Sequence, residues 1–231
     1  MGLGMPERFL GFDRFAGDAY RERLLKKAGL DRPAPRKGLK ALDLGCGHGE
    51  VALYLAERGW QVDAIDIASS PEWAQRAKAA KGRIRFSVGD AQALKSAAGR
   101  YDLVMEKDMA HHAADPVKAF AELRRVAKPG AEVLVIEGNR LNPIFYLHLT
   151  LMEGHEHFTL WTLRRLLESA GIHGARIERV EARVWPFNRA WAQSVMGVVQ
   201  DGVEWLFFLK PLVCYHIAHW RKPAAVKKGK V

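Results

Sequence analysis

One loop constrains the fold of this 231-residue chain more than any other feature: Gly45, Gly47 and Gly49 alternate with other residues directly after the mostly apolar segment Ala41–Leu44. Glycines at this spacing accept positive φ angles and let a ligand approach the backbone closely. A helical pattern begins at Val51, so the free N–H groups of a helix start would face the same ligand. The segment is predicted to be a strand–loop–helix unit that binds a small molecule.

The spacing of these glycines distinguishes two kinds of ligand. A dinucleotide-binding loop places its last two glycines three positions apart, whereas Gly47 and Gly49 are two apart. Asp43 adds a carboxylate beside exposed backbone amides, which suits a ligand with both an ammonium and a carboxylate group. We therefore favour an amino-acid-type ligand over a nicotinamide dinucleotide.

Strand and helix patterns alternate over residues 39–137. The predicted strands are 39–44, 61–67, 83–88, 101–106 and 132–137, and the predicted helices are 48–58, a helix opened by Ser70-Pro71, and 115–128, which Pro129-Gly130 should stop. Such alternation predicts right-handed βαβ units and a parallel sheet, with ligands bound beyond the carboxyl ends of the strands. A helix at 159–170, a strand at 176–185, helices over 188–209 and a strand at 212–221 should follow.

Two acidic residues stand where this sheet would bind a nucleoside. Asp66 ends the second predicted strand, about twenty residues after the glycine loop, where a carboxylate can accept hydrogen bonds from both ribose hydroxyls. Asp90 follows the third predicted strand and could accept a proton from an exocyclic adenine amine. The alternatives are a surface acid or helix cap at Asp66 and a turn aspartate at Asp90.

Together these features resemble the class I S-adenosylmethionine-dependent methyltransferases of the small-molecule type. The resemblance extends over about residues 39–171. It is carried by Leu42-Asp43-Leu44-Gly45-Cys46-Gly47-His48-Gly49, Asp66, Gly89-Asp90-Ala91, Tyr101-Asp102-Leu103-Val104, His111-His112, Glu122-Leu123-Arg124-Arg125-Val126 and Lys128-Pro129-Gly130. It implies an α/β, Rossmann-like fold: a seven-stranded, mostly parallel sheet of order 3-2-1-4-5-7-6, with the last strand antiparallel and helices on both sides.

The resemblance also implies S-adenosylmethionine as the cofactor and S-adenosylhomocysteine as the product. The cofactor-binding residues would be Asp43, Gly45, Cys46, Gly47, Asp66, Ile67, Asp90, Ala91, Glu106, Lys107 and Tyr20. In this arrangement Gly45 and Gly47 cradle the methionine part, and Asp66 binds the ribose. Ile67 would pack on the adenine, and Asp90 and Ala91 would address its edge. Glu106 and Lys107 would line the sulfonium region, and Tyr20 would belong to a lid.

Histidines are the best candidates for a general base, because their unperturbed pKa lies near neutrality. His111 and His112 follow the fourth predicted strand, and His155 and His157 precede the helix after the fifth. The alternatives are scaffold histidines at the first pair and solvated imidazoles at the second. The spacing of Glu106, Asp108, His112, His155 and His157 is not diagnostic of a metal site, so no metal is predicted.

Composition bounds the remaining organisation. We expect a helical lid and linker over residues 1–38, a methyltransferase domain over 39–222 with a helical insert at about 186–210, and a basic tail over 223–231. About half of the formal net charge of +10 comes from the end of the chain, at Arg221, Lys222, Lys227, Lys228 and Lys230, which favours a soluble domain with a solvated basic tail. Nucleic acid or an anionic membrane surface is the alternative partner of a basic chain. No zinc-finger or RNA-recognition signature supports nucleic acid, which is not expected as a partner.

The cysteines and the N-terminus indicate the compartment. The chain has two distant cysteines, Cys46 and Cys214, and lacks an apolar signal core, and both features predict a cytoplasmic protein.

The insert carries an excess of aromatic residues: Trp191, Trp205, Phe207 and Phe208. Three interpretations remain open for it, namely the wall of a pocket for an apolar acceptor, a homodimer contact, or peripheral contact with a membrane. We expect methyl transfer to an oxygen, nitrogen or carbon of a small, apolar or aromatic metabolite, such as a quinone, lipid or secondary metabolite. The alternatives are a tRNA or rRNA methyltransferase and a non-catalytic cofactor-binding protein of the same fold.

Overall fold

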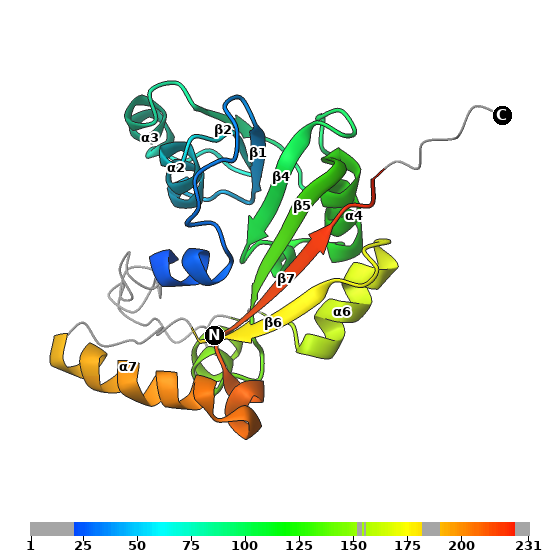
Figure 1. Cartoon of the computed structure of the whole chain (residues 1–231). Helices are drawn as coiled ribbons and strands as arrows, with labels where there is room; N and C mark the ends of the chain where they lie inside the picture. The colour runs from blue at the N-terminus through cyan, green and yellow to red at the C-terminus, as the bar shows by residue number, and fades with distance from the viewer. Residues whose placement is uncertain (1–20, 152–153, 155, 182–189, 225–231) are drawn as a thin grey trace, which may run out of the picture.

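The computed structural model describes residues 21–151, 154, 156–181 and 190–224 (Figure 1). Its centre is a seven-stranded sheet of order β3-β2-β1-β4-β5-β7-β6, which confirms the order expected from the sequence. The strands are β1 (Lys40–Leu44), β2 (Gln61–Asp66), β3 (Ile84–Val88), β4 (Tyr101–Lys107), β5 (Ala127–Gly138), β6 (Arg176–Val180) and β7 (Tyr215–Arg221). The first five strands in this order pair in parallel, whereas β7 runs antiparallel to both β5 and β6.

Helices cover both faces of the sheet (Figure 1). They are α2 (Glu50–Glu57), α3 (Trp73–Ala79), α4 (Pro116–Val126), α5 (Pro143–Phe145), α6 (Leu160–Ser169) and α7 (Ala190–Trp205). Shorter turns are η2 (Ala110–His112), the π-helical η3 (Tyr146–Thr150) and η4 (Phe207–Leu212). A further helix spans residues 21–27. The helix over 21–27, α2 and α3 lie on one face, and α4 and α6 lie on the other.

The sheet separates two apolar cores. Ala41, Leu103 and Met105 point into the core beneath α2, while Leu42 and Val104 point into the core beneath α4 and α6. Because helices cover both faces, the central parallel strands bury side chains on both sides and are apolar almost without interruption. The polar residues at the carboxyl ends of these strands are therefore the places where the layers leave room for a ligand.

Two helix boundaries differ from the sequence-based predictions. The helix expected to open at Ser70-Pro71 begins only at Trp73, and its N-cap residue Glu72 makes no side-chain cap bond. The Ser70 hydroxyl instead donates a hydrogen bond to the Glu72 carboxylate, and its oxygen lies 2.9 Å from Nδ1 of His48. A hydroxyl held in this way cannot cap the backbone of the helix, so the helix starts later.

The second difference lies at the end of α4. This helix ends at Val126 rather than at Pro129-Gly130, because Ala127 is already extended and pairs with Tyr101 of β4. Strand β5 therefore begins five residues earlier than the predicted 132 and contains Pro129. The register between β4 and β5 shifts after Tyr101, and an irregularity of this kind accommodates a proline within a strand.

The predicted insert corresponds to α7 and η4, which lie between β6 and β7. The greater part of the predicted lid, residues 1–20, and most of the predicted tail lie outside the described residues, so both stay predictions. Within the part of the chain that the structure describes, no helix is both long enough and apolar enough to cross a membrane.

Candidate active site

The glycine loop joins β1 to α2 in a conformation that only glycine adopts easily. Gly45, Gly47 and Gly49 have φ angles of 73°, 51° and 86°, in the left-handed region. A Cβ atom at Gly45 would lie 2.2 Å from Cγ of Met109, and one at Gly49 would lie 2.6 Å from the ring of Phe86. At Gly47 no heavy atom lies within 4 Å of that position, so this glycine borders open space that a ligand can enter.

Asp66 holds this loop from the end of β2. Its carboxylate accepts hydrogen bonds from the backbone N–H of Gly47 at 2.8 Å and of Ala68 at 3.3 Å. The next residue, Ile67, is 72% exposed, which is unusual for a large apolar side chain beside an acid. Asp90 lies after the neighbouring strand β3, exposed, and accepts from the backbone N–H of Gln92 at 2.8 Å. The three predicted nucleoside contacts thus stand at the ends of two adjacent strands.

Asp43 is the buried carboxylate beneath the loop. It is 1% exposed, and no hydrogen-bond partner of its Oδ2 atom is found among the described residues. Burial raises the pKa of Asp43 to about 7, against a lowering effect of the Ala52 backbone N–H. An unsatisfied buried carboxyl group is costly, and a cationic group would relieve it. Cys46, also buried in the loop, has its pKa raised by burial and by the charge of Asp43, so it is not a reactive thiolate.

Two fully buried glutamates end the next two strands. Glu106 of β4 and Glu137 of β5 both accept hydrogen bonds from the backbone of the turn η2: Met109 N–H donates to Glu106 at 3.1 Å, and Ala110 N–H donates to Glu137 at 2.8 Å. Burial raises the pKa of both carboxyls well above the usual range; the charge of Glu137 adds to the shift of Glu106, and that of Asp108 adds to the shift of Glu137.

Three histidine rings pack against one another, with tilted planes, beside this pair. The Nδ1 atom of His111 lies 2.7 Å from Oε2 of Glu137, and its ring centroid lies 4.1 Å from that of His112 and 4.3 Å from that of His157. His157 is buried and His112 is exposed. Gly138 makes this approach feasible, because a Cβ there would lie 2.0 Å from Cδ2 of His157.

A lysine–aspartate–tyrosine group completes the site. The Lys107 ammonium donates to Asp108 at 2.5 Å, and the Tyr215 hydroxyl donates to the same carboxylate oxygen at 3.2 Å. Burial opposes ionisation of Asp108, but the charges of Lys107 and His111 outweigh it and lower the pKa of Asp108. Asp108 also has a φ of 53°, a strained conformation for a non-glycine residue of the kind that concentrates at functional sites.

The structure therefore brings together most of the predicted site residues. Asp43, Gly45, Gly47 and Asp66 form one group, and Glu106, Lys107, His111 and His157 form a second. His112 stacks on His111 but points outward, while Tyr20 and His155 lie outside the described residues. Among the described residues no group of three or more His, Cys, Asp or Glu side chains is placed to hold a metal ion.

The sequence reasoning missed four residues of the second group: Glu137, Gly138, Phe145 and Tyr215. Phe145 packs edge-on against His157, with centroids 5.8 Å apart, and against Tyr215 at 5.3 Å. Glu137 and Gly138 end the fifth predicted strand, and that position alone could have identified them. Tyr215 begins an antiparallel strand far along the chain, so no local signal places it here.

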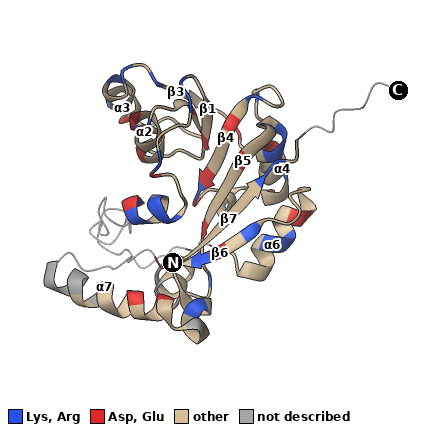
Figure 2. Cartoon of the chain, viewed as in Figure 1, with Lys and Arg blue, Asp and Glu red and all other residues tan. Residues whose placement is uncertain are grey.

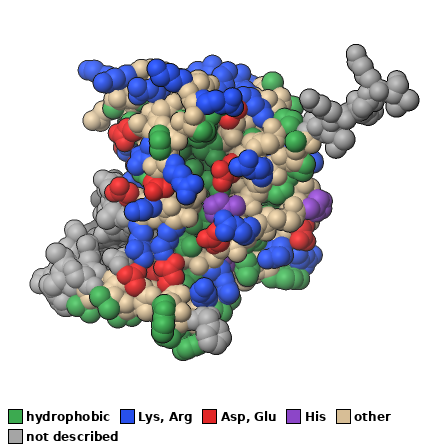
Figure 3. Space-filling model, viewed as in Figure 1, with side chains coloured by type: hydrophobic (Ala, Val, Ile, Leu, Met, Phe, Trp, Pro, Cys, Tyr) green, Lys and Arg blue, Asp and Glu red, His purple; other side chains and the backbone are tan. Residues whose placement is uncertain are grey.

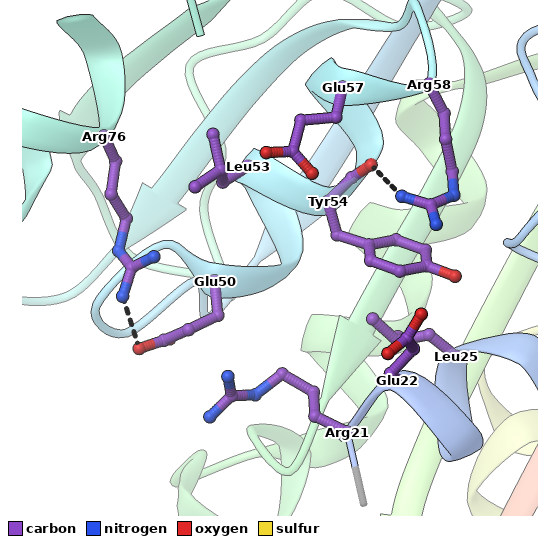
Figure 4. A pocket seen from close by; sticks show the side chains of 9 residues that line it. All are labelled: Arg21, Glu22, Leu25, Glu50, Leu53, Tyr54, Glu57, Arg58 and Arg76. Carbon is purple, nitrogen blue, oxygen red and sulfur yellow. Dashed lines mark hydrogen bonds and ion pairs between the residues drawn. The ribbon is translucent and has the colours of Figure 1, made fainter. Parts of the chain in front are cut away.

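A separate pocket of about 310 Å³ lies between the helix over residues 21–27 and α2 (Figure 4). It is lined by Arg21, Glu22, Leu25, Glu50, Leu53, Tyr54, Glu57, Arg58 and Arg76. Arg76 is engaged by Glu50 at 2.7 Å, and Arg58 donates to the Tyr54 carbonyl at 3.0 Å. None of the predicted site residues lines this pocket, so it lies beside the site rather than within it.

Comparison with known proteins identifies the family. A sequence profile described as "Methyltransferase domain" matches residues 42–135, which include the glycine loop, Asp66 and both buried strands β4 and β5 as far as Val135. Residues 42–135 therefore form a methyltransferase domain, and the sheet around them has the fold of the class I S-adenosylmethionine-dependent methyltransferases. The cofactor of this protein is S-adenosylmethionine.

Curated relatives are similar over part of their length. The chain is 28% identical to the ubiquinone biosynthesis O-methyltransferase of Dinoroseobacter shibae over 71% of each chain. It is 32% identical to the chloroplastic tocopherol O-methyltransferase of Arabidopsis thaliana over 61% of this chain and 40% of that protein. A match of 31% to the ubiquinone biosynthesis O-methyltransferase of Pseudomonas aeruginosa spans about half of each chain.

Solved structures confirm the fold. The [4+2]-cyclase SpnF superimposes with a TM-score of 0.66 at 22% identity, covering 88% of this chain and 81% of that chain. Phosphoethanolamine N-methyltransferase 2 of Haemonchus contortus, solved with S-adenosyl-L-methionine, gives 0.66 at 18% identity over 93% of this chain and 56% of that chain. At these identities the likeness concerns the fold, which one of the two proteins uses for cyclisation.

Proposed function

We propose that this protein transfers a methyl group from S-adenosylmethionine to an oxygen of a small, apolar acceptor such as a phenol or hydroquinone. The observation that carries the proposal is the open glycine loop held by Asp66, with the unsatisfied Asp43 carboxyl beneath it. The relatives named as ubiquinone and tocopherol O-methyltransferases favour oxygen as the acceptor atom and an apolar acceptor as the substrate class.

The residues of the first group fit the cofactor. Asp43 would neutralise its ammonium group, and the main chain at Gly45 and Gly47 would contact its methionine part. Asp66 would exchange its bond to the Gly47 N–H for the ribose hydroxyls, and Ile67 would pack on the adenine, whose edge Asp90 and Ala91 would meet. Once bound, the cofactor supplies an electrophilic methyl group on a positively charged sulfur.

The second group supplies the acceptor chemistry. Glu106 and Lys107 would line the region of the sulfonium, and the buried setting strengthens their electrostatic effect on it. His111 is the candidate base: in the neutral ring whose Nδ1–H donates to Glu137, the basic lone pair is on Nε2. The acceptor hydroxyl would lose its proton to Nε2 as its oxygen forms the bond to the methyl carbon. The carbon–sulfur bond breaks at the same time, and S-adenosylhomocysteine leaves.

His157 would position His111 rather than react. Its ring is buried between those of His111 and Phe145, so it limits how the base can rotate. A positioned base and acceptor raise the rate by removing the entropic cost of bringing them together. His155 stays a prediction, as does the lid that would contain Tyr20.

Two expected partners belong to the same proposal. An acceptor of this class dissolves in lipid, so peripheral contact with a membrane would give the enzyme access to it. A homodimer is the alternative use of the same apolar insert.

The test is an acceptor panel assayed by mass spectrometry for S-adenosylhomocysteine and for the methylated product. The panel contains catechols and hydroquinones with apolar tails, their amine counterparts, and an RNA transcript. We expect turnover with the hydroxylated apolar acceptors and none with RNA. Binding of the cofactor with no turnover on any acceptor would favour a non-catalytic protein, and turnover on RNA would favour the nucleic-acid alternative.

A further inference from the structure

Helix α7 exposes its apolar residues to solvent, whereas an ordinary surface helix buries them. Val195, Val198, Val199 and Trp205 share one face of it and are exposed, Val198 by 74% and Trp205 by 83%. A surface helix normally buries its apolar stripe against the core. Figure 3 shows hydrophobic side chains gathered along the lower edge of the molecule, below acidic side chains.

The two acidic residues of α7 are held in ion pairs with another helix. Asp201 accepts from Arg23 at 2.6 Å, and Glu204 is paired with Lys27. These basic residues belong to the helix over 21–27, which lies above α7 in Figure 2. The ion pairs fix the rotation of α7 about its axis: the charged face meets the body of the protein, and the apolar face is left outside.

The apolar face continues into the segment after β5. Leu141, Leu147 and Leu151 are exposed there, Leu147 by 60%. The amide of Asn142 donates to the Leu212 carbonyl at 2.7 Å, and the amide of Asn139 donates to the Val213 carbonyl at 2.7 Å, so this segment is tied to the end of η4. An exposed apolar surface made from two segments of the chain marks an interaction site.

This surface leads to the acceptor end of the site. Phe145 lies between the exposed leucines Leu141 and Leu147 in the chain, and its buried ring contacts His157 and Tyr215. The exposed leucines therefore flank, in the chain, a residue that packs against the acceptor end of the site.

We propose that α7, η4 and residues 141–151 form a surface that rests on an anionic lipid bilayer, from which the apolar acceptor enters. The proposal rests on the proposed function for its acceptor. A bilayer is favoured over a second copy of the chain by charge: both acids of α7 are neutralised by ion pairs with Arg23 and Lys27, and Lys210 lies on η4 beside Phe208. Tryptophan and lysine beside an apolar stripe are typical of helices that lie in the membrane interface.

The experiment is vesicle flotation of the full chain with two matched variants. Trp205→Glu removes the most exposed aromatic residue of the surface, whereas Trp161→Glu makes the same change on α6, where Trp161 is 65% exposed on a different face. We expect the wild type and the α6 variant to float with phosphatidylcholine vesicles that contain phosphatidylglycerol. Trp205→Glu should partition about tenfold less, because a large apolar side chain no longer leaves water. Lys210→Glu should weaken the preference for the anionic vesicles.

Two outcomes would overturn the proposal. In the first, the wild type does not float, or both tryptophan variants lose flotation equally. In the second, light scattering shows a stable dimer that Trp205→Glu dissociates, which would assign the surface to a second copy.

Activity separates this proposal from the proposed function. Trp205→Glu should methylate a short-chain soluble acceptor at the wild-type rate but a long-chain acceptor embedded in vesicles about tenfold more slowly, in proportion to its lost partitioning. Flotation without turnover on either acceptor would leave the surface in place and reject the methyl transfer. Turnover on both acceptors without flotation would support the methyl transfer and reject the membrane surface.

Discussion

The two halves of the sheet are built on different principles. In the half where we place the cofactor, strands β1 to β4 are parallel, and the groups proposed to bind the cofactor are backbone amides and carboxylates within a few residues of each strand end. In the acceptor half, β5, β7 and β6 are antiparallel, and the polar groups come from segments as distant as Asp108, His157 and Tyr215. The family profile ends at residue 135, close to the boundary between them.

This difference between the two halves explains how proteins of one fold can act on many different acceptors. A cofactor that never changes is bound by a local motif, so the motif is shared and can be recognised. The acceptor half is assembled from tertiary contacts, and it is the part that fold neighbours with other chemistry need not share. Variants in the first half should therefore change cofactor affinity, and variants in the second should change turnover.

The largest effect is expected at Gly45. In Gly45→Ala the new methyl group would overlap Met109, because it would lie 2.2 Å from the Cγ atom of Met109. The alanine would also have to adopt the φ angle of 73° that the glycine has. We expect the loop to move and cofactor binding by calorimetry to weaken by more than about 100-fold, since a shifted backbone misplaces several hydrogen bonds.

Gly130→Ala is the matched control for Gly45→Ala. It has a φ of 81° with no heavy atom within 4 Å of the new Cβ, far from the loop. It carries the same backbone strain, of about 1 kcal/mol, and should bind the cofactor normally. Equal losses in the two variants would mean that backbone strain, not the cradle, causes the effect.

Next in size is His111. His111→Gln should lower kcat about 100-fold and leave cofactor affinity unchanged, because only proton removal from the acceptor is lost. In a profile of kcat against pH, the acidic limb should disappear from this variant. Since burial lowers the pKa of His111 from the ordinary histidine value of 6.5, that limb in the wild type should lie below pH 6.5.

His112→Gln tests the specificity of that result. His112 is the neighbouring residue and stacks on His111 at 4.1 Å, but it is exposed. We expect kcat within a factor of about 3 of the wild type, as for most surface substitutions. A loss of kcat as large as that of His111→Gln would contradict the assignment of His111 as the base. It would mean that the two rings act only by packing together.

Asp66→Ala should have a smaller effect. Two hydroxyl hydrogen bonds to a carboxylate would be lost, which corresponds to about 10- to 100-fold in cofactor affinity. Asp63 on the same strand is the control, since its carboxylate is already bound by Arg85, Arg100 and Tyr101. Asp63→Asn should change thermal stability but not affinity; unchanged affinity in Asp66→Ala would contradict the ribose assignment.

The smallest effect is a pH dependence of cofactor binding. Burial raises the pKa of Asp43 to about 7, so below pH 7 the carboxyl is mostly neutral and cannot pair with an ammonium group. Binding should tighten as the pH rises to about 7 and then level off, with affinity about tenfold weaker one unit below the pKa. Without the cofactor, the same raised pKa makes the protein lose stability as the pH rises from 3.8, the ordinary pKa of an aspartate in the unfolded chain, toward 7.

Asp43→Asn provides the check on this titration. It should bind the cofactor more weakly at pH 8 and show no change in affinity between pH 6 and about 7, where the wild type titrates. Calorimetry at a series of pH values measures both. A wild-type affinity that stayed flat over this range would place another group at the ammonium.

The cofactor half could be predicted from the sequence almost entirely. The spacing of Gly45, Gly47 and Gly49 gave the loop, the strand ends gave Asp66 and Asp90, and the resemblance gave the strand order that the structure has. Each of these depends on residues that are close in the chain, so periodicity and turn chemistry are enough. The predicted start of α3 was wrong because the Ser70 hydroxyl, the expected helix cap, donates a hydrogen bond to the Glu72 carboxylate instead.

The amino-acid sequence by itself determined the parallel core and the glycine loop in which we place the cofactor, because both follow from local pattern. The tertiary structure alone decided that Glu137, His111 and His157 meet, since their strands and loops come together only when the sheet closes. It also decided which way α7 faces. A helical pattern gives an apolar stripe but not its direction, and here the ion pairs of Asp201 and Glu204 with Arg23 and Lys27 turn that stripe outward.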